Sequence, residues 1–107
     1  MKLQPAELVL IRMQFHQAQG SKIRPALVLL DTGDEDFVAA PITSQSRSSD
    51  FDLVLIDWQA AGLNVPSIAR IHKLTVLAKA DIARRLGVCS ISDQANLSKL
   101  LCSAFCP

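Results

Sequence analysis

One segment of the sequence, residues 20–30, joins a glycine turn and two cations to a continuous apolar run. Gly20 permits a tight or positive-φ turn, and Pro25 fixes φ immediately after Arg24. The next five residues, Ala-Leu-Val-Leu-Leu, are typical of a strand buried in a core. Arg24 is therefore expected at the mouth of a rigid strand, where a planar guanidinium suits phosphate or carboxylate oxygens. The alternative is a surface arginine whose aliphatic stem covers the core.

Length and hydrophobic content predict one domain over residues 1–107. Half of the 107 residues are hydrophobic, which is enough for a single core. The apolar runs are much shorter than the roughly 18–20 residues of a membrane span, and the N-terminus lacks the apolar segment of a signal peptide. We therefore expect a cytoplasmic protein with no membrane association.

The three cysteines, Cys89, Cys102 and Cys106, form neither the close pairs of a zinc ribbon nor an even-numbered disulfide set. Reduced thiols are expected. Cys102 and Cys106 lie four residues apart in a predicted helix, which favours small buried hydrophobic side chains over a metal or redox role. The sequence predicts no metal site and no cofactor.

Charge is unevenly distributed along a chain whose net charge is only +1. Residues 1–30 carry four cations and one acid, residues 31–57 one cation and seven acids, and residues 58–107 six cations and two acids. This bipolar pattern is compatible with one anion-attracting face. It argues against a nonspecific, histone-like nucleic-acid binder.

Strands dominate the first two thirds of the predicted secondary structure. Apolar and β-branched residues predict strands over residues 7–15, 26–31, 37–42 and 51–56. The acidic segment 31–36 is typical of a hairpin turn, and its spacing does not match a calcium-binding loop. Residues 44–50 form a polar loop long enough to act as a flap.

The remaining segments alternate between short helices and strands. Residues 57–63 indicate a single helical turn ended by Gly62, and Pro66 should open a strand over residues 67–71 that continues to Leu77. A helix over 78–86, a strand over 87–90 and a helix from Ser92, as N-cap, through Phe105 follow. The predicted fold is mainly β (α+β), a small bent antiparallel sheet or barrel with short helical insertions and a C-terminal helix.

Six segments in this order resemble the PemK/MazF-like toxins, and together they cover nearly the whole chain. They are residues 7–11, 20–29, 40–45, 61–63, 66–74 and 86–87. The resemblance implies an SH3-like barrel of the PemK/CcdB type and a homodimer. It also implies metal-independent, sequence-selective endoribonuclease activity on single-stranded RNA, a cognate antitoxin encoded beside the toxin, and weak DNA binding by the antitoxin complex.

Metal-free RNA cleavage by the neighbouring 2′-hydroxyl needs a base, an acid for the departing 5′-oxygen, and donors for the charged phosphorane. The resemblance places Arg24 and Thr43 on the scissile phosphate, with Ser44 as a second hydroxyl donor. It also places Arg70 where the arginine of related toxins stabilises or protonates the phosphate. Further RNA contacts are expected from Lys22, Ser44, Gln45, Arg47 and Lys73.

Strand alternation would put Arg70 and His72 on one face, which makes His72 a candidate base or acid. Well-known relatives carry an aspartate there, so this residue departs from the family; histidine can perform the same proton transfer nearer neutral pH. The alternative is an exposed or RNA-facing histidine without a catalytic role. His16 matches no family residue and is expected at the surface.

Other departures concern the first strand, the first loop and the aromatic residues. Ala6-Glu7 replaces the usual Gly-Asp, so Glu7 keeps a carboxylate for a structural or catalytic role. The loop between Phe15 and Gly20 lacks an Asp-Pro-Thr pattern. Phe15, Phe51 and Trp58 are the candidate base-stacking residues, with Trp58 expected to be the exposed one.

Two other functions remain open. A non-catalytic or decayed barrel that binds RNA or protein is the main alternative, supported by the departures at Ala6 and His72. Topoisomerase poisoning, as in CcdB-like relatives, is disfavoured because Arg24, Thr43 and Arg70 match the ribonuclease branch.

Overall fold

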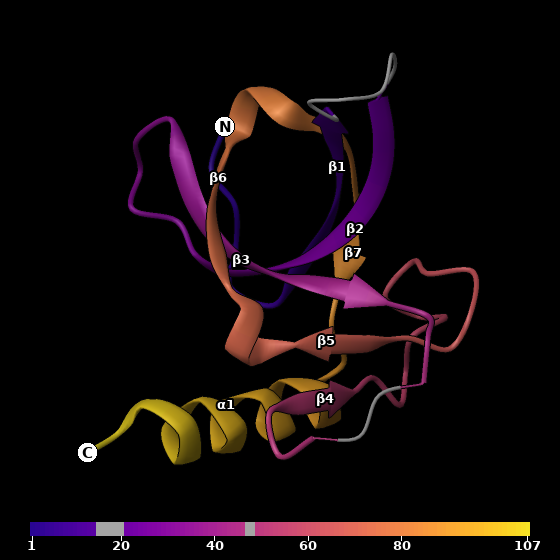
Figure 1. Ribbon diagram of the computed structural model, residues 1–107, viewed down its shortest axis with the longest axis vertical. Coiled ribbons are helices and arrows are strands. Elements are labelled where there is room, and N and C mark those ends of the chain that lie inside the picture. The colour runs from indigo at the N-terminus through magenta and orange to yellow at the C-terminus, as the bar shows by residue number, and fades with distance from the viewer. Residues whose placement is uncertain (15–20, 47–48) are drawn as a thin grey trace.

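The computed structural model describes residues 1–14, 21–46 and 49–107. In these residues an antiparallel sheet curls into a small barrel, and one long helix packs beneath it (Figure 1). The strands are β1 (Glu7–Gln14), β2 (Ser21–Leu30), β3 (Asp36–Thr43), β4 (Asp52–Val54), β5 (Ile68–Arg70), β6 (Thr75–Ala78) and β7 (Ile82–Val88). The other elements are two 3₁₀ turns, η1 (Ile71–Lys73) and η2 (Lys79–Asp81), and the helix α1 (Ile91–Phe105).

The sheet runs in the order β4-β5-β3-β2-β1-β7, and β6 also pairs with β3. The first half of β3 pairs with β6, and its last two residues, Ile42 and Thr43, pair with β5. β6 leads through η2 into β7, which pairs with β1 on the other side of the barrel (Figure 1). β3 therefore connects the barrel to the smaller β4–β5 extension.

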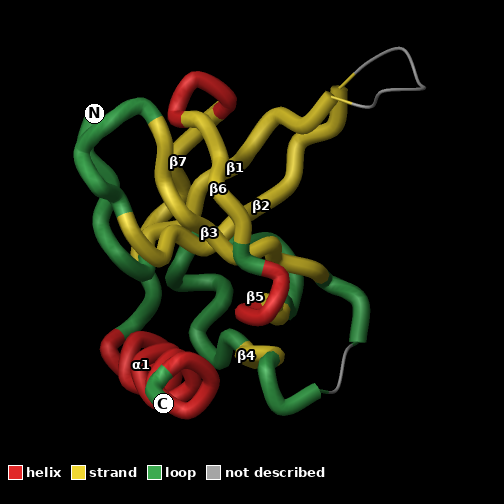
Figure 2. Tube along the Cα trace, turned by 60° about the vertical axis from the view of Figure 1, so that its left-hand side comes forward, coloured by secondary structure: helices red, strands yellow, loops and turns green. Residues whose placement is uncertain are grey.

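β2 is longer than the predicted strand over residues 26–31, because it continues through Pro25. A proline lacks an N–H donor and is tolerated in strands where that donor is not required. β2 pairs with β3 only from Ala26 onward, so the earlier half of β2 is an edge on that side. The paired ends of β1 and β2 project beyond the rest of the sheet (Figure 2). Gly20, Phe15 and His16 lie outside the described residues.

Two apolar clusters form the core. One fills the barrel around the fully buried Phe37, Val9 and Val28. The other includes Leu8, Leu27 and Ile42 together with the buried Leu97 of α1. This helix lies beneath the barrel (Figure 1). Among the described residues, no helix is long and apolar enough to cross a membrane.

The helix α1 begins two residues earlier than predicted, because Ser90 and not Ser92 is its N-cap. The Ser90 Oγ accepts a hydrogen bond from the backbone N–H of Asp93 at 3.1 Å. The buried Asp93 carboxylate accepts the backbone N–H groups of Ile56 (3.0 Å) and Asp57 (2.9 Å). These bonds fix the start of the helix against the turn that follows β4.

The predicted single helical turn over 57–63 is confirmed: the Ala61 N–H donates to the carbonyl of Asp57 at 3.2 Å, and Gly62, with a positive φ, ends the turn. Two other predicted elements are wrong. The predicted strand over 67–77 is divided by η1 into β5 and β6. The predicted helix over 78–86 is η2 followed by β7, which also includes the first two residues of the predicted strand over 87–90. Residues 82–88 contain good helix formers, but β1 offers a partner strand, and tertiary pairing overrides local propensity.

The 57–63 turn packs directly on β7 through two glycines. Gly62 has a φ of +99°, which favours glycine, and a Cβ there would lie 3.1 Å from the Cβ of Leu86. A Cβ on Gly87 would lie 2.8 Å from the carbonyl oxygen of Ala61. Both family-like segments, 61–63 and 86–87, therefore belong to one backbone contact.

Ala6 keeps a glycine-like conformation although it is an alanine. Its φ is +71°, its N–H donates to the carbonyl of Val28, and its own carbonyl accepts the N–H of Cys89. The neighbouring Glu7 is buried and accepts hydrogen bonds from Arg85, which hold the pKa of this carboxyl below its usual value. Glu7 therefore has a structural role where β1 pairs with β7.

The acidic hairpin turn connects β2 and β3 as predicted, and its carboxylates bind backbone groups. Asp31 accepts hydrogen bonds from the N–H groups of Leu3 (2.7 Å) and Gly33 (2.8 Å) and an ion pair from Lys79 (2.9 Å). Asp34 accepts the N–H of Asp36 at 2.9 Å. These contacts explain the acidic composition of the turn.

The cysteine prediction is only partly correct. All three cysteines are free, and Cys89 is buried, but Cys102 and Cys106 are exposed and do not pack in the core. Both lie in the last turn and C-cap of α1, where the helix extends past the sheet it covers.

Candidate active site

The strand register places Arg24, Thr43 and Arg70 on one face of the sheet. In antiparallel strands, directly opposed residues point to the same face, and alternate residues of a strand share a face. Ala26 of β2 lies opposite Pro41 of β3, so Arg24 shares the face of Pro41 and Thr43. Thr43 in turn lies opposite Ile68 of β5, whose face Arg70 shares.

This face changes from core to surface along β3. Phe37 and Ala39 are buried inside the barrel, whereas Pro41 is exposed and Thr43 is half-buried. The predicted phosphate-binding residues therefore lie just beyond the end of the barrel core. We call this surface, with Arg24, Thr43, Arg70 and His72, the basic face.

Arg24 is exposed at the rim of an apolar pocket with a volume of about 250 Å³. Within the described chain it has no ion pair and no side-chain hydrogen bond, so its guanidinium is free to bind an external anion. The pocket wall beside Arg24 is mostly apolar. The other lining residues are Ile11, Met13, Pro25, Ala26, Ala39, Pro41, Ile42, Thr75 and Leu77.

Thr43 ends β3 and begins the polar loop. Its Oγ1 accepts the backbone N–H of Gln45 at 3.1 Å, a local turn that fixes the hydroxyl at the strand end. The hydroxyl proton remains available to donate to a phosphate oxygen. Ser44 and Gln45 follow and are exposed, while Arg47 lies outside the described residues.

Arg70 is held by an acidic residue on the neighbouring strand. Asp52 of β4 lies opposite Arg70 of β5, and Arg70 Nε donates to Asp52 Oδ1 at 3.0 Å. The Asp52 side chain is only 2% exposed, against 24% for Arg70. Burial raises the pKa of Asp52, but the Arg70 hydrogen bond and the nearby Ser49 hydroxyl together hold it below its ordinary value. Asp52 is thus a charged partner for Arg70.

His72 contacts Arg70, but not for the reason that the sequence suggested. His72 lies in the 3₁₀ turn η1 and not on the same strand as Arg70. The turn nevertheless returns the imidazole to Arg70, whose Nη2 is 3.4 Å from His72 Nε2. The ring of Phe51 packs against the other side of the imidazole, with centroids 5.8 Å apart and planes inclined by 48°.

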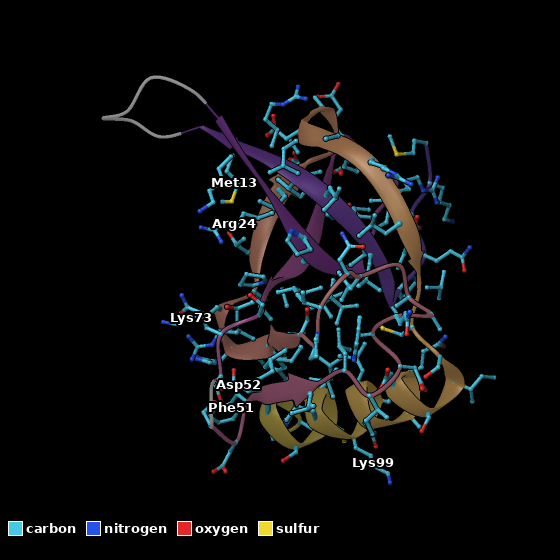
Figure 3. All side chains as sticks on the ribbon, turned by 90° about the vertical axis from the view of Figure 1, so that its right-hand side faces the viewer. Met13, Arg24, Phe51, Asp52, Lys73 and Lys99 are labelled. Carbon is cyan, nitrogen blue, oxygen red and sulfur yellow. The ribbon has the colours of Figure 1, made fainter. Side chains whose placement is uncertain are left out.

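The basic face can be followed in Figure 3, where Arg24, Lys73, Phe51 and Asp52 lie along one side of the molecule. Lys73 ends η1 and is exposed, and Lys22 is exposed on β2 opposite Met13. No three His, Cys, Asp or Glu side chains come together as a possible metal site in the parts of the chain that the structure describes.

Sequence reasoning missed Asp52 and the position of Phe51. Both residues were expected in a strand over residues 51–56. No local sequence pattern indicates which residues of another strand would lie opposite them. Phe51 is 42% exposed beside His72, whereas Trp58 is half-buried against the core, so the expectation that Trp58 is the exposed aromatic is wrong. An acidic residue that begins one short strand and an arginine that ends another were the available signals.

Comparison with protein-family models identifies the chain. The model described as "PemK-like, MazF-like toxin of type II toxin-antitoxin system" matches residues 4–105. The chain belongs to this family. The fold prediction of a PemK/MazF-type barrel with a C-terminal helix is confirmed. No curated protein sequence matches the chain significantly.

Several solved structures share this fold, and two of the three described next carry the name MazF. The toxin MazF-mt6 from Mycobacterium tuberculosis is 24% identical, with a TM-score of 0.70 over 91% of this chain and 95% of that one. A MazE–MazF structure from Deinococcus radiodurans is 18% identical, with a TM-score of 0.77 over 95% and 94%. An endoribonuclease in complex with its cognate antitoxin, from a mycobacterial species, is 14% identical, with a TM-score of 0.73 over 99% and 98%.

Proposed function

We propose that this PemK/MazF-like chain is a metal-independent endoribonuclease that cleaves single-stranded RNA at selected sequences in the cytoplasm, as the toxin of a toxin–antitoxin pair. The observation that carries the proposal is the shared face of Arg24, Thr43 and Arg70, with His72 in contact with Arg70. Membership of the toxin family supports it.

The Arg70–His72 contact defines which proton His72 can carry. Arginine has only donor groups and stays protonated, so the 3.4 Å contact is a hydrogen bond only when His72 Nε2 is an acceptor. At 3.4 Å this hydrogen bond is long and weak. The Nε2 lone pair is unprotonated, so Nε2 can accept the proton of a 2′-hydroxyl once Arg70 Nη2 turns to the phosphate of the bound RNA.

Cleavage then follows from the positions of the cations. The 2′-oxygen attacks the phosphorus, the 2′-proton passes to His72, and the bond to the 5′-oxygen breaks, leaving a cyclic phosphate. Arg70 and Arg24 supply N–H donors for the charge that develops on the phosphorane oxygens, and Thr43 adds a hydroxyl donor. The protonated His72 can return its proton to the departing 5′-oxygen.

The surroundings of this site suit a single strand of RNA. Phe51 is exposed beside His72 and offers an aromatic surface for a base. Polar and basic groups are added to the site by Ser44 and Gln45, which follow Thr43, and by Lys73, which follows His72. Lys22 adds general attraction for the phosphate backbone. Arg47 belongs to the same polar loop and is proposed to assist.

A cleavage assay in EDTA tests the proposal. Purified protein is incubated with a long single-stranded RNA, and the new 5′ ends are mapped. Discrete cuts are expected from the wild type and from Lys99→Ala, which removes an exposed cation on α1 away from the basic face (Figure 3). Arg24→Ala and Arg70→Ala should each abolish the cuts.

The same assay separates the alternative function. RNA that stays intact but binds measurably, with binding weakened by Arg24→Ala, would favour a non-catalytic RNA-binding module. RNA that neither binds nor is cut would reject both functions and leave a protein-binding role for the barrel.

Two partners are also proposed. A relative in complex with its cognate antitoxin supports an antitoxin protein as the natural inhibitor. A homodimer is proposed because several large apolar side chains are exposed, among them Ile23 (48%) and Val76 (64%). Light scattering during gel filtration should give about twice the chain mass of 11.6 kDa.

A further inference from the structure

Two arginine–carboxylate pairs in this protein have different geometries. In the first, Arg85 Nε and Nη2 donate to the two oxygens of Glu7, and Glu7 Oε1 also accepts the backbone N–H of Gln4 at 3.0 Å. Both carboxylate oxygens of Glu7 therefore bind the edge of the guanidinium that Nε and Nη2 form. We call such a side-on pair closed, and this geometry is expected for a structural ion pair.

The second pair, Arg70 with Asp52, is open. Only Nε of Arg70 contacts the carboxylate, at Oδ1. Asp52 Oδ2 is buried and has no hydrogen-bond partner of acceptable geometry among the described residues. The Nη2 group, which would complete a side-on pair, instead lies 3.4 Å from His72 Nε2.

The open geometry has a consequence for the basic face. A carboxylate bound to Nε alone fixes the plane of the guanidinium and leaves both terminal nitrogens for other acceptors. A closed pair like Arg85–Glu7 would take Nη2 away from His72. The Ser49 hydroxyl lies near the same carboxylate, so Asp52 keeps its charge without a second contact to Arg70.

We propose that Asp52 is a positioning residue, which holds Arg70 by Nε so that its terminal nitrogens face the scissile phosphate and His72 Nε2. This inference rests on the proposed ribonuclease function. Asp52 is nearly buried and therefore acts through Arg70 without touching RNA. Its negative charge also balances the permanent cation of Arg70 beside the imidazole.

The test compares Asp52→Asn with Glu7→Gln, which removes the same charge from the closed pair. Steady-state cleavage is measured well below the melting temperature of each variant, with folding checked by circular dichroism. Asp52→Asn should lower kcat roughly tenfold or more with KM changed less than about threefold, because transition-state positioning and not RNA binding is lost. Glu7→Gln should lower the melting temperature and leave the kcat of the folded protein near wild type.

A second measurement does not depend on activity. The Nε–H signal of Arg70 in nitrogen-15 NMR should be protected from exchange in the wild type and exposed in Asp52→Ala. In an Arg70→Lys background, Asp52→Asn should change kcat less than about twofold, since coupled residues are not additive.

The outcomes separate the two proposals. Wild-type cleavage with an unchanged kcat in Asp52→Asn, or an equal loss in the Arg70→Lys background, would overturn the role of Asp52 and leave the ribonuclease intact. A wild type that does not cleave RNA although its Arg70 Nε–H is protected would overturn the proposed function, and the positioning role with it.

Discussion

Replacing Gly87 with alanine would place a methyl group 2.8 Å from the carbonyl oxygen of Ala61 and 3.1 Å from its carbonyl carbon. Both atoms belong to backbone, so the clash cannot be relieved by rotating a side chain. The turn 57–63 or the strand β7 must move instead, although β7 is paired with β1 and the turn is closed by its own backbone hydrogen bonds.

Three glycines separate the two costs of adding a methyl group. Gly33 has a φ of +92° and nothing within 4 Å of an added Cβ, so Gly33→Ala tests the backbone alone. Gly87 has the clash without a positive φ, and Gly62 has both a φ of +99° and a Cβ contact of 3.1 Å.

The magnitudes follow from these geometries. A positive φ costs an alanine about 1–2 kcal/mol, and overpacking costs about 1–3 kcal/mol. Alanine returns about 0.4–1 kcal/mol by restricting the unfolded chain. We expect net losses of about 1 kcal/mol for Gly33→Ala, about 1–2 kcal/mol for Gly87→Ala and about 2–4 kcal/mol for Gly62→Ala.

Urea unfolding followed by circular dichroism measures all three, and each kcal/mol should lower the melting temperature by roughly 4–8 °C in a domain near this size. A neutral Gly87→Ala would refute the claim that the turn and β7 are in rigid backbone contact. Equal losses for Gly33→Ala and Gly62→Ala would show that the contact with Leu86 contributes nothing.

Three further predictions concern titratable groups. His72→Ala should lower the kcat of RNA cleavage, because it removes the imidazole that contacts Arg70, and an unchanged kcat would remove His72 from the mechanism. Burial raises the pKa of the Cys89 thiol to about 11, so iodoacetamide should label only the two exposed cysteines of the folded protein within minutes. Mass spectrometry counts the labels, and a third label on the folded protein would contradict the burial of Cys89. The hydrogen bond from the Leu3 N–H, with those from Lys79 and Gly33, lowers the pKa of Asp31 in the folded protein. The stabilisation of the fold by the charged Asp31 is therefore complete above the unfolded-state pKa of about 3.9 and is lost as the pH falls below it. Denaturation curves of wild type and Asp31→Asn should differ at pH 7 and converge in acid.

Local signals were sufficient for part of the fold and of the candidate site. The alternation in β1, the apolar run of β2 and the acidic turn before β3 all lie where the sequence placed them, because residues adjacent in the chain decide these elements. Register was the missing information: a shift of one residue turns every side chain to the other face.

The sequence by itself determined the family, the barrel class, the C-terminal helix and the residue types that a metal-free ribonuclease site would need. Turn chemistry, hydrophobic period and the two glycine segments carry that information locally. Only the tertiary structure decided that residues 82–88 are a strand, that His72 reaches Arg70 from a 3₁₀ turn, and that Asp52 holds Arg70 by one nitrogen. Each of these depends on a partner strand 18 or more residues away or on a turn that propensity does not specify, so the packing of the whole sheet determines them.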